Sequence, residues 1–279
     1  SQLARGCAAD AARGRGGAAS PGRCAYTPLA PRPNRTDPSG GPSSTTRLNF
    51  MEQSLLSIGK SDSDSGGLPQ MADLRRRLCA EFVGTFVIVL TMGSCLLSPS
   101  SPTWRPVATG LVVGATTYST VSVSGGHLNP AVTLSLSLAR RDHLRPGEWL
   151  VAVLYCATQI LAGVMAGRCL CALLHPRSAA VEPIAPFDLE HAVLTEGIYS
   201  FLVCLVFCGL RVLRREAPGS EDDVDGLLAL SVGCATAAGA DAAFGISGAC
   251  INPAVAVGYA WTGAGLRWCP WWLAAQLAG

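Results

Sequence analysis

Hydrophobic residues gather in long, nearly uncharged blocks from residue 78 onward, and these blocks predict membrane-spanning helices. The first block, residues 78–97, contains one charged side chain, that of Glu81, among its twenty residues. A helix of this length rises about 30 Å, the thickness of the hydrocarbon core of a bilayer. Four further blocks have a suitable length, at residues 106–123, 149–174, 192–210 and 226–244. The pattern predicts an all-α, multi-pass membrane protein.

The two ends of the chain differ from these blocks. Residues 1–70 are rich in Gly, Ser, Pro, Ala and Arg and lack the apolar runs that would offset the entropy cost of ordering, so we expect them to be disordered. Residues 269–279 form an apolar run of eleven residues, which is too short to cross a bilayer. We therefore expect a disordered segment, 1–70, and a membrane domain, 71–279, that is cut inside its last helix.

Arginines in the short connections predict the orientation of the chain. Three clusters fall on one side, and they consist of Arg75, Arg76 and Arg77, of Arg140, Arg141 and Arg145, and of Arg211, Arg214 and Arg215. The connections on the opposite side hold only Arg105, Arg177 and Arg267. Because short cytoplasmic loops carry the excess of Lys and Arg, the N-terminus is expected to be cytoplasmic.

Two short apolar stretches, residues 131–139 and 254–260, are about half a bilayer long and predict re-entrant half-helices. Each follows an Asn-Pro pair, Asn129-Pro130 or Asn252-Pro253. Asparagine is a good N-cap and proline is favoured in the first helical turn, so both sequences indicate a loop followed by a helix start. Irregular backbone at membrane depth is tolerated only where it is buried or lines a wet cavity.

The chain contains an internal repeat. Its two Asn-Pro-Ala-Val sequences are 123 residues apart, and a glutamate, Glu81 or Glu196, lies in the first helix before each. With three spans in each half, the second half enters from the opposite side, so the repeat is inverted. Inverted repeats with interrupted helices place a site at the midplane, where the two half-helix N-termini meet.

These motifs resemble those of the aquaporin (major intrinsic protein) family. The resemblance runs from about residue 78 to the end, through Glu81, residues 124–132 (Ser-Gly-Gly-His-Leu-Asn-Pro-Ala-Val), Gln159, Glu196 and residues 247–255 (Ser-Gly-x-x-x-Asn-Pro-Ala-Val). The valine after the second Asn-Pro-Ala looks most like the plant tonoplast intrinsic proteins. The resemblance implies a six-helix fold with two half-helices, here with a truncated sixth helix, and a homotetramer in a lipid bilayer. It also implies a passive channel for water.

The two Asn-Pro-Ala motifs, Asn129-Pro130-Ala131 and Asn252-Pro253-Ala254, are the expected centre of the pore. A water molecule in a narrow apolar tube loses most of its hydrogen bonds, and the two side-chain amides can replace some of them. Each half-helix N-terminus behind them is equivalent to roughly half a positive charge, which repels a dehydrated cation or hydronium ion. A neutral molecule meets no such barrier, and this is the established basis of ion exclusion in aquaporin-type pores.

Four other polar side chains leave alternatives open. For Glu81 and Glu196, the resemblance implies that they hold the re-entrant loops through backbone amides, and a proton relay is the alternative because intramembrane carboxylates are often functional. For His127 the alternatives are loop packing and a pH gate. For Asp241 they are a solvated loop carboxylate and a cation-attracting outer mouth.

The family sets its constriction with four positions, which an ungapped count carries onto Thr109, Ala240, Ala249 and Val255. A shift of one turn would replace Ala240 with Thr236. The water-selective pattern uses an aromatic residue, a histidine and an arginine there, whereas this chain has only small or medium side chains. We therefore expect small neutral solutes such as ammonia, urea, hydrogen peroxide and glycerol to pass beside water.

Composition narrows the competing functions. The net charge of +2 comes without a basic stripe, so no nucleic-acid partner is expected. The twelve cysteines lack the spacing of a zinc or redox site, so no metal or cofactor is expected. An enzyme would need a nucleophile and a base in a recognisable frame, which the sequence does not offer. A non-conducting membrane scaffold stays open, as do a phosphorylation role for Ser61, Ser63 and Ser65 and the choice between plasma and internal membranes.

Overall fold

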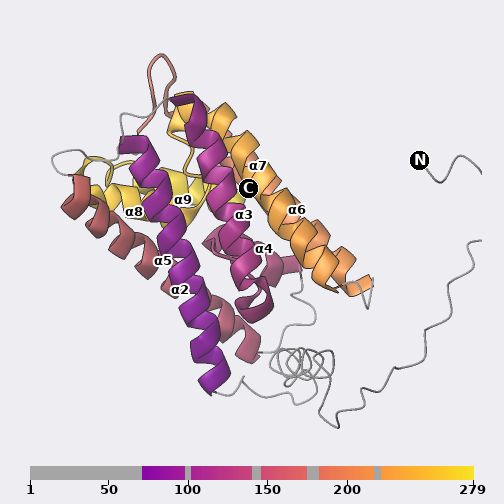
Figure 1. The fold of residues 1–279 in the computed structure, drawn as a ribbon. Helices are drawn as coiled ribbons and strands as arrows, with labels where there is room; N and C mark the ends of the chain where they lie inside the picture. Colours follow the sequence, from indigo (N-terminus) through magenta and orange to yellow (C-terminus); the bar gives the residue numbers. More distant parts are fainter. Residues whose placement is uncertain (1–70, 98–101, 140–145, 175–181, 217–220) are drawn as a thin grey trace, which may run out of the picture. The chain divides into compact units, whose positions relative to one another are not determined.

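The computed structural model describes residues 71–97, 102–139, 146–174, 182–216 and 221–279 (Figure 1). The chain divides into two units, residues 1–53 and 54–279, and every described residue belongs to the second. The expected disorder of residues 1–70 lies outside the described residues. So do the serines of that segment and four of the arginines used for orientation, Arg140, Arg141, Arg145 and Arg177.

The described residues form helices and no strand. The long helices are α2 (Met71–Leu97), α3 (Arg105–Ser124), α5 (Pro146–Leu174), α6 (Leu189–Glu216) and α7 (Glu221–Ser247). The short ones are η1 (Pro102–Trp104), α4 (Pro130–Ala139), α8 (Pro253–Tyr259), the π-helical turn η3 (Ala260–Ala264) and α9 (Cys269–Ala278). Each predicted span lies within one long helix, so the all-α prediction is confirmed.

Helix α3 differs from the other four long helices in composition. Helices α2, α5, α6 and α7 are long and apolar enough to cross a membrane, whereas seven of the twenty residues of α3 are Ser or Thr. Several of these hydroxyl groups donate to the carbonyl four residues earlier, as Thr116 does to Val112 at 2.7 Å and Thr120 to Thr116 at 2.7 Å. These bonds satisfy the hydroxyl groups within the helix, which lowers the cost of placing them in an apolar environment.

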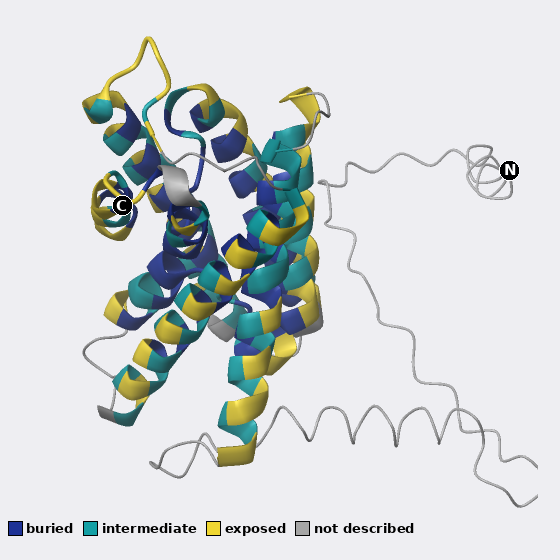
Figure 2. Cartoon of the chain, turned by 90° about the vertical axis from the view of Figure 1, so that its left-hand side faces the viewer, coloured by how far each residue is buried: buried dark blue, intermediate teal, exposed yellow. Residues whose placement is uncertain are grey.

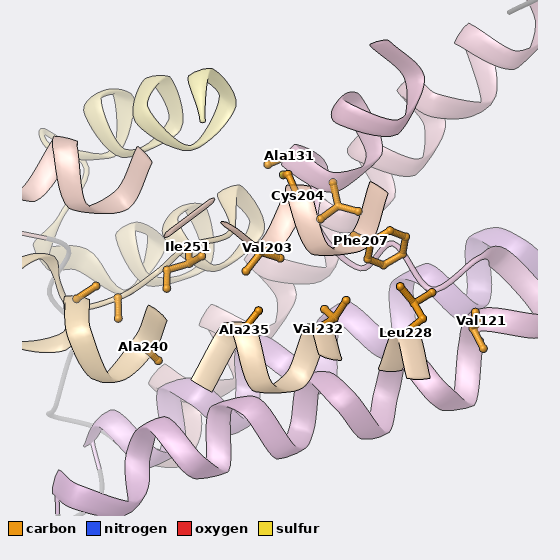
Figure 3. Packing of buried hydrophobic residues seen from close by; sticks show 13 residues of the cluster. Val121, Ala131, Val203, Cys204, Phe207, Leu228, Val232, Ala235, Ala240 and Ile251 are labelled. Carbon is orange, nitrogen blue, oxygen red and sulfur yellow. The ribbon is translucent and has the colours of Figure 1, made fainter. Parts of the chain in front are cut away.

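The long helices pack in pairs around the two half-helices, α4 and α8. Helix α3 packs against α7, α6 against α7, and α2 against α5 (Figure 1). Between α6 and α7, apolar side chains such as Val203, Phe207, Leu228 and Val232 meet in one buried cluster (Figure 3). A second cluster joins α2 and α5 to α8. The two clusters fix the long helices on either side of the half-helices.

Helices α5 and α8 approach each other through glycine. A Cβ atom on Gly163 would lie 2.2 Å from the carbonyl oxygen of Ala254, and one on Gly167 would lie 2.2 Å from that of Gly258. These two glycines are one turn apart on α5, so they form a smooth strip against which the second half-helix lies. Small residues at such crossings let helix backbones come close in membranes.

The outward faces of the helices remain apolar. Figure 2 shows exposed positions along the outer sides of the long helices and buried ones around their centre. Exposed large hydrophobic side chains include Val83, Leu111, Tyr118, Leu161, Leu205 and Leu230. Such faces are unsuited to water and suited to lipid or to a neighbouring subunit.

Candidate functional site

Asn129 and Asn252 join the two re-entrant loops at the centre of the bundle. The Oδ1 atom of each asparagine caps its own half-helix, accepting from Ala131 N at 2.8 Å or from Ala254 N at 2.9 Å. Each Nδ2 group donates across to the opposite loop, from Asn129 to Ile251 O at 3.2 Å and from Asn252 to Leu128 O at 3.0 Å. Because an amide nitrogen carries two hydrogens, each side chain retains a second donor.

Glu81 binds the first loop from helix α2. Its Oε1 accepts from the Ser124 hydroxyl at 2.6 Å and from His127 N at 3.1 Å. Its Oε2 accepts from Leu128 N at 2.7 Å and from Gln159 Nε2 at 2.8 Å. The carboxyl group is fully buried, and its four hydrogen bonds satisfy both oxygens. These include the backbone amide contacts that the family resemblance implies.

Glu196 binds the second loop in the same way from helix α6. Its Oε1 accepts from the Ser247 hydroxyl at 2.6 Å and from Cys250 N at 3.0 Å. Its Oε2 accepts from Ile251 N at 2.7 Å and from Gln276 Nε2 at 2.7 Å. Gln276, on α9, therefore plays the part that Gln159 plays for Glu81. The sequence analysis missed Gln276, although its place in the third helix of the second half was a signal for it.

The two glutamates hold strained backbone. Leu128 has a φ of 51° and Ile251 a φ of 50°, in the left-handed region that side chains beyond Gly and Asn rarely adopt. Their amide groups bind the glutamates, and their carbonyl groups accept from the asparagines of the opposite loop. Strain of this kind persists only where the surroundings fix it, and here bonds on both sides of each residue do so.

A cavity of about 30 Å³ lies at the two asparagines. A buried water needs roughly 10 to 15 Å³ of such space, so the cavity has room for one or two water molecules. Its polar lining includes Asn129, Asn252, His127, Thr117 and Thr236. The rest is mostly aliphatic, from Ile88, Met92, Val113, Val132, Val203 and Val232. Polar groups thus face an otherwise apolar passage where the two half-helices meet.

A second cavity, of about 20 Å³, lies farther along the bundle and shares Met92 with the first. We call it the outer cavity, and the one at the asparagines the central cavity. The outer cavity is lined by Thr109, Ala240 and Ala249, three of the four positions expected at the constriction. Thr236, the alternative to Ala240, lines the central cavity one turn deeper.

The cavity-lining residues recur every four positions along the long helices. On α3 they include Arg105, Thr109, Val113 and Thr117, and on α7 they include Val232, Thr236, Ala240 and Phe244. Residues four apart lie above one another on one helix face. The two stripes therefore run past both cavities, which lie one beyond the other along these helices.

Val255, the fourth position expected at the constriction, lies on helix α8. It is fully buried in an apolar cluster with Val89, and it is absent from the lining of the outer cavity among the described residues. However, Asn252, three residues before it, lines the central cavity, and Tyr259, four residues after it, lines the outer one. Val255 itself lines neither cavity among the residues that the structure describes, so its place at the constriction stays a prediction.

His127 packs within the first loop. Its ring contacts those of Tyr155 and Phe207 edge-on, at centroid distances of 5.3 and 5.9 Å, and its Nδ1 lies 3.2 Å from Thr133 Oγ1. It also lines the central cavity, so both the packing and the gating alternatives remain predictions.

Asp241 differs from its predicted setting. One of its two alternatives was a solvated loop carboxylate, but it lies within helix α7 on an exposed face. The loop alternative was wrong because position 241 already falls inside the predicted span 226–244, which forms part of α7. The alternative of a cation-attracting outer mouth stays a prediction.

Other residues that line the outer cavity were not expected from the sequence, among them Arg105, Phe244 and Tyr259. Arg105 had been counted only among loop charges. The signal was present, because Arg105 and Phe244 each lie four residues from an expected constriction position, Thr109 and Ala240.

Comparisons with known proteins agree with this arrangement. The model of the family described as major intrinsic protein matches residues 69–272. Aquaporin NIP2-2 of Zea mays is 32% identical over 187 residues, which cover 65% of this chain and 60% of the relative. The putative aquaporin NIP4-1 of Arabidopsis thaliana is 29% identical over 224 residues, covering 74% and 73%. The chain thus spans only about 60% of the length of some relatives it matches, and its expected likeness to tonoplast proteins stays a prediction.

A solved structure shows the same fold. The aquaglyceroporin from Plasmodium falciparum superposes with a TM-score of 0.50 at 18% identity, over 74% of this chain and 90% of that one. The fold, the paired loops and the family match together establish that the chain belongs to the major intrinsic protein family.

Proposed function

We propose that the protein is a passive membrane channel for water and small neutral solutes. The observation that carries this proposal is the pair of Asn129 and Asn252 amides, which line the central cavity where two half-helices begin. Each amide has a donor beyond its bond to the opposite loop, and that donor can bind the oxygen of a passing molecule. The surrounding aliphatic side chains offer no competing partners that would retain it.

Ion exclusion follows from the same geometry. Helices α4 and α8 begin at Pro130 and Pro253, next to the two asparagines, so both positive helix ends face the central cavity. A cation entering a space of this size must shed most of its water and then meets roughly half a positive charge from each helix. We therefore propose that cations and protons are excluded while neutral molecules pass.

The expected constriction accepts more than water. Thr109, Ala240 and Ala249 are small, and the fourth expected position, Val255, has no charge. We propose that ammonia, urea, hydrogen peroxide and glycerol also permeate. Of two relatives of the chain, one is named an aquaporin and the other an aquaglyceroporin, so both classes of solute occur among the similar proteins.

The buried glutamates support this passage and do not catalyse a reaction. All four hydrogen bonds of each carboxyl group go to loop amides, a serine hydroxyl and a glutamine amide. Neither Glu81 nor Glu196 lines either cavity among the residues described. A proton relay would need access to the passage, so we favour a structural role for both residues.

Orientation and assembly complete the proposal. The end of α3 meets the start of α5 and the end of α6, through bonds from Tyr155 to Ser124 O and from Arg211 to Gly125 O. The arginines of the last turns of α6 therefore lie at that end of the bundle, and the positive-inside rule supports a cytoplasmic N-terminus. The exposed apolar helix faces leave room for the homotetramer that the family implies.

Osmotic shrinkage of vesicles tests the channel. Vesicles that contain the protein should shrink several-fold faster than protein-free vesicles after a hyperosmotic shock, and re-swell faster when urea or glycerol is the osmolyte. Stopped-flow light scattering measures both rates. Protein-containing vesicles that behave like empty ones would support a non-conducting scaffold instead.

The variant Val255→Arg tests whether this residue belongs to the constriction. An arginine there should fold only if it reaches hydrated space, because an unpaired charge at membrane depth costs at least about 2.5 kcal/mol. If the arginine side chain reaches the passage, it should narrow that passage. The ratio of urea to water permeability should then fall by about tenfold, which corresponds to a change of roughly 1.4 kcal/mol in the difference between the two permeation barriers. Val255→Met, which adds bulk without charge, is the control. A folded Val255→Arg protein with an unchanged ratio would remove Val255 from the constriction.

A further inference from the structure

The outer cavity contains two large side chains one helical turn outside the small ones. Arg105 lies four residues before Thr109 on α3, and Phe244 lies four residues after Ala240 on α7. The two helices pack side by side and run in opposite directions, so both offsets point toward the same end of the bundle. The cavity therefore has an inner layer of small side chains and an outer layer formed by an arginine and an aromatic ring.

Arg105 and Phe244 touch each other across this outer layer. The guanidinium carbon of Arg105 lies 5.3 Å from the centre of the Phe244 ring. A guanidinium group over an aromatic face is attracted by the ring quadrupole, and this contact holds the long arginine side chain in one place. Both side chains are half-buried, so they occupy the mouth without being sealed into the protein.

We infer that Arg105 and Phe244 form the selectivity layer of this channel, displaced one helical turn outward from the expected constriction. The inference rests on the proposed channel function. Water-selective relatives place an aromatic residue and an arginine at the constriction, whereas this chain has Thr109, Ala240 and Val255 there. An arginine and an aromatic ring are still present, but the arginine comes from α3 and the ring from α7, each one turn beyond Thr109 or Ala240, and neither comes from position 255 on α8.

This layer has two consequences for permeation. The bulk of the two side chains limits the width of the mouth, so urea and glycerol are slowed there more than water is. The fixed charge of the guanidinium group repels cations before they reach the half-helices. Discrimination by size is thus set at the mouth, and the inner layer adds little to it.

Substitution of the layer tests the inference through a ratio of permeabilities. Arg105→Ala and Phe244→Ala should each raise the ratio of glycerol to water permeability, by about tenfold for the arginine, while water flux persists. Arg105→Lys should raise it less, because lysine keeps length and charge. The matched control is Arg267→Ala. Arg267 also stacks on an aromatic ring, that of Trp268 at 4.1 Å, but it does not line the outer cavity among the described residues. Its removal should leave the ratio unchanged.

Outcomes for the layer and for the channel can be separated. Wild-type vesicles without water flux would refute the channel. Equal glycerol-to-water ratios in wild type and Arg105→Ala, with water flux retained, would refute only the layer. If Arg105→Ala does not fold, the glycerol-to-water ratios of Arg105→Lys and Phe244→Ala are compared with that of the wild type instead.

Labelling with phenylglyoxal, a small reagent for guanidinium groups, tests Arg105 without any measurement of transport. Mass spectrometry should find Arg105 modified in the reconstituted protein, and an unmodified Arg105 beside a modified Arg267 would overturn the inference.

Discussion

Replacing Gly163 with alanine should prevent the protein from accumulating in its folded form. The added Cβ atom would lie 2.2 Å from the carbonyl oxygen of Ala254 and 3.0 Å from its carbonyl carbon. Both atoms belong to the backbone of the second half-helix, so no flexible side chain can move aside. Overpacking of this kind costs about 1 to 3 kcal/mol or more, a large part of the stability of a typical protein. Displacing α8 would also move Asn252 away from its partner, Leu128.

Size-exclusion chromatography in detergent, with a fluorescent fusion, measures this effect directly. We expect Gly163→Ala to lose the folded peak of the wild type, and Gly167→Ala to do the same because of its contact with Gly258. Gly209→Ala is the control, because no atom lies within 4 Å of its added Cβ. Alanine in a helix is favoured over glycine by roughly 0.5 to 1 kcal/mol, so this variant should accumulate at least as well as wild type. A normal peak for Gly163→Ala would show that α5 and α8 are less tightly packed.

Replacing Glu196 with leucine should be similarly damaging. The carboxyl group is fully buried and accepts from four donors, two of which are the backbone amides of Cys250 and Ile251. Each buried amide left without a partner costs about 1 to 3 kcal/mol, so the two together cost about 2 to 6 kcal/mol. Ile251 would also lose a bond that holds its strained φ of 50°. We therefore expect Glu196→Leu to lose most of its folded protein in the same chromatographic assay.

The isosteric variant Glu196→Gln separates structural support from proton transfer. The NH₂ group of the new glutamine would face hydrogen-bond donors in place of one carboxylate oxygen. We therefore expect lower thermal stability, and a water flux that falls in proportion to the folded protein lost. Glu190→Gln is the control, because Glu190 lies exposed in the first turn of the same helix. A proton relay predicts a different pattern, with full stability, normal water flux and a selective loss of proton movement. That pattern would contradict the structural role.

Local motifs made the centre of the site predictable from the sequence. The loop and helix start after each Asn-Pro depend on neighbouring residues, so the half-helices appear where the sequence indicated them, at Pro130 and Pro253. The inverted repeat then indicated that the two half-helices meet end to end at the midplane. The reciprocal bonds of Asn129 and Asn252 follow from that relation, although no local pattern specifies their acceptors, Ile251 and Leu128.

Features that depend on contacts between distant helices could not be predicted in this way. The layer of Arg105 and Phe244 forms because α3 packs against α7. The hydropathy pattern of one helix does not indicate which other helix packs against it. Gln276 was hidden for the same reason, since it reaches Glu196 from a helix eighty residues later. The hydroxyl groups of α3, in contrast, are satisfied by local contacts. They look unsuited to a membrane, but they donate to carbonyl groups of their own helix.

Simultaneous measurement of water flux and proton flux in the same vesicles tests the central claim most directly. The vesicles contain the protein and a trapped pH-sensitive dye, and they receive an osmotic shock and a pH step together with a potassium ionophore that sets the membrane potential. We expect shrinkage to accelerate with the amount of protein, while the rate of internal pH change stays at that of protein-free vesicles. Proton movement that rises with the amount of protein, without faster shrinkage, would contradict it.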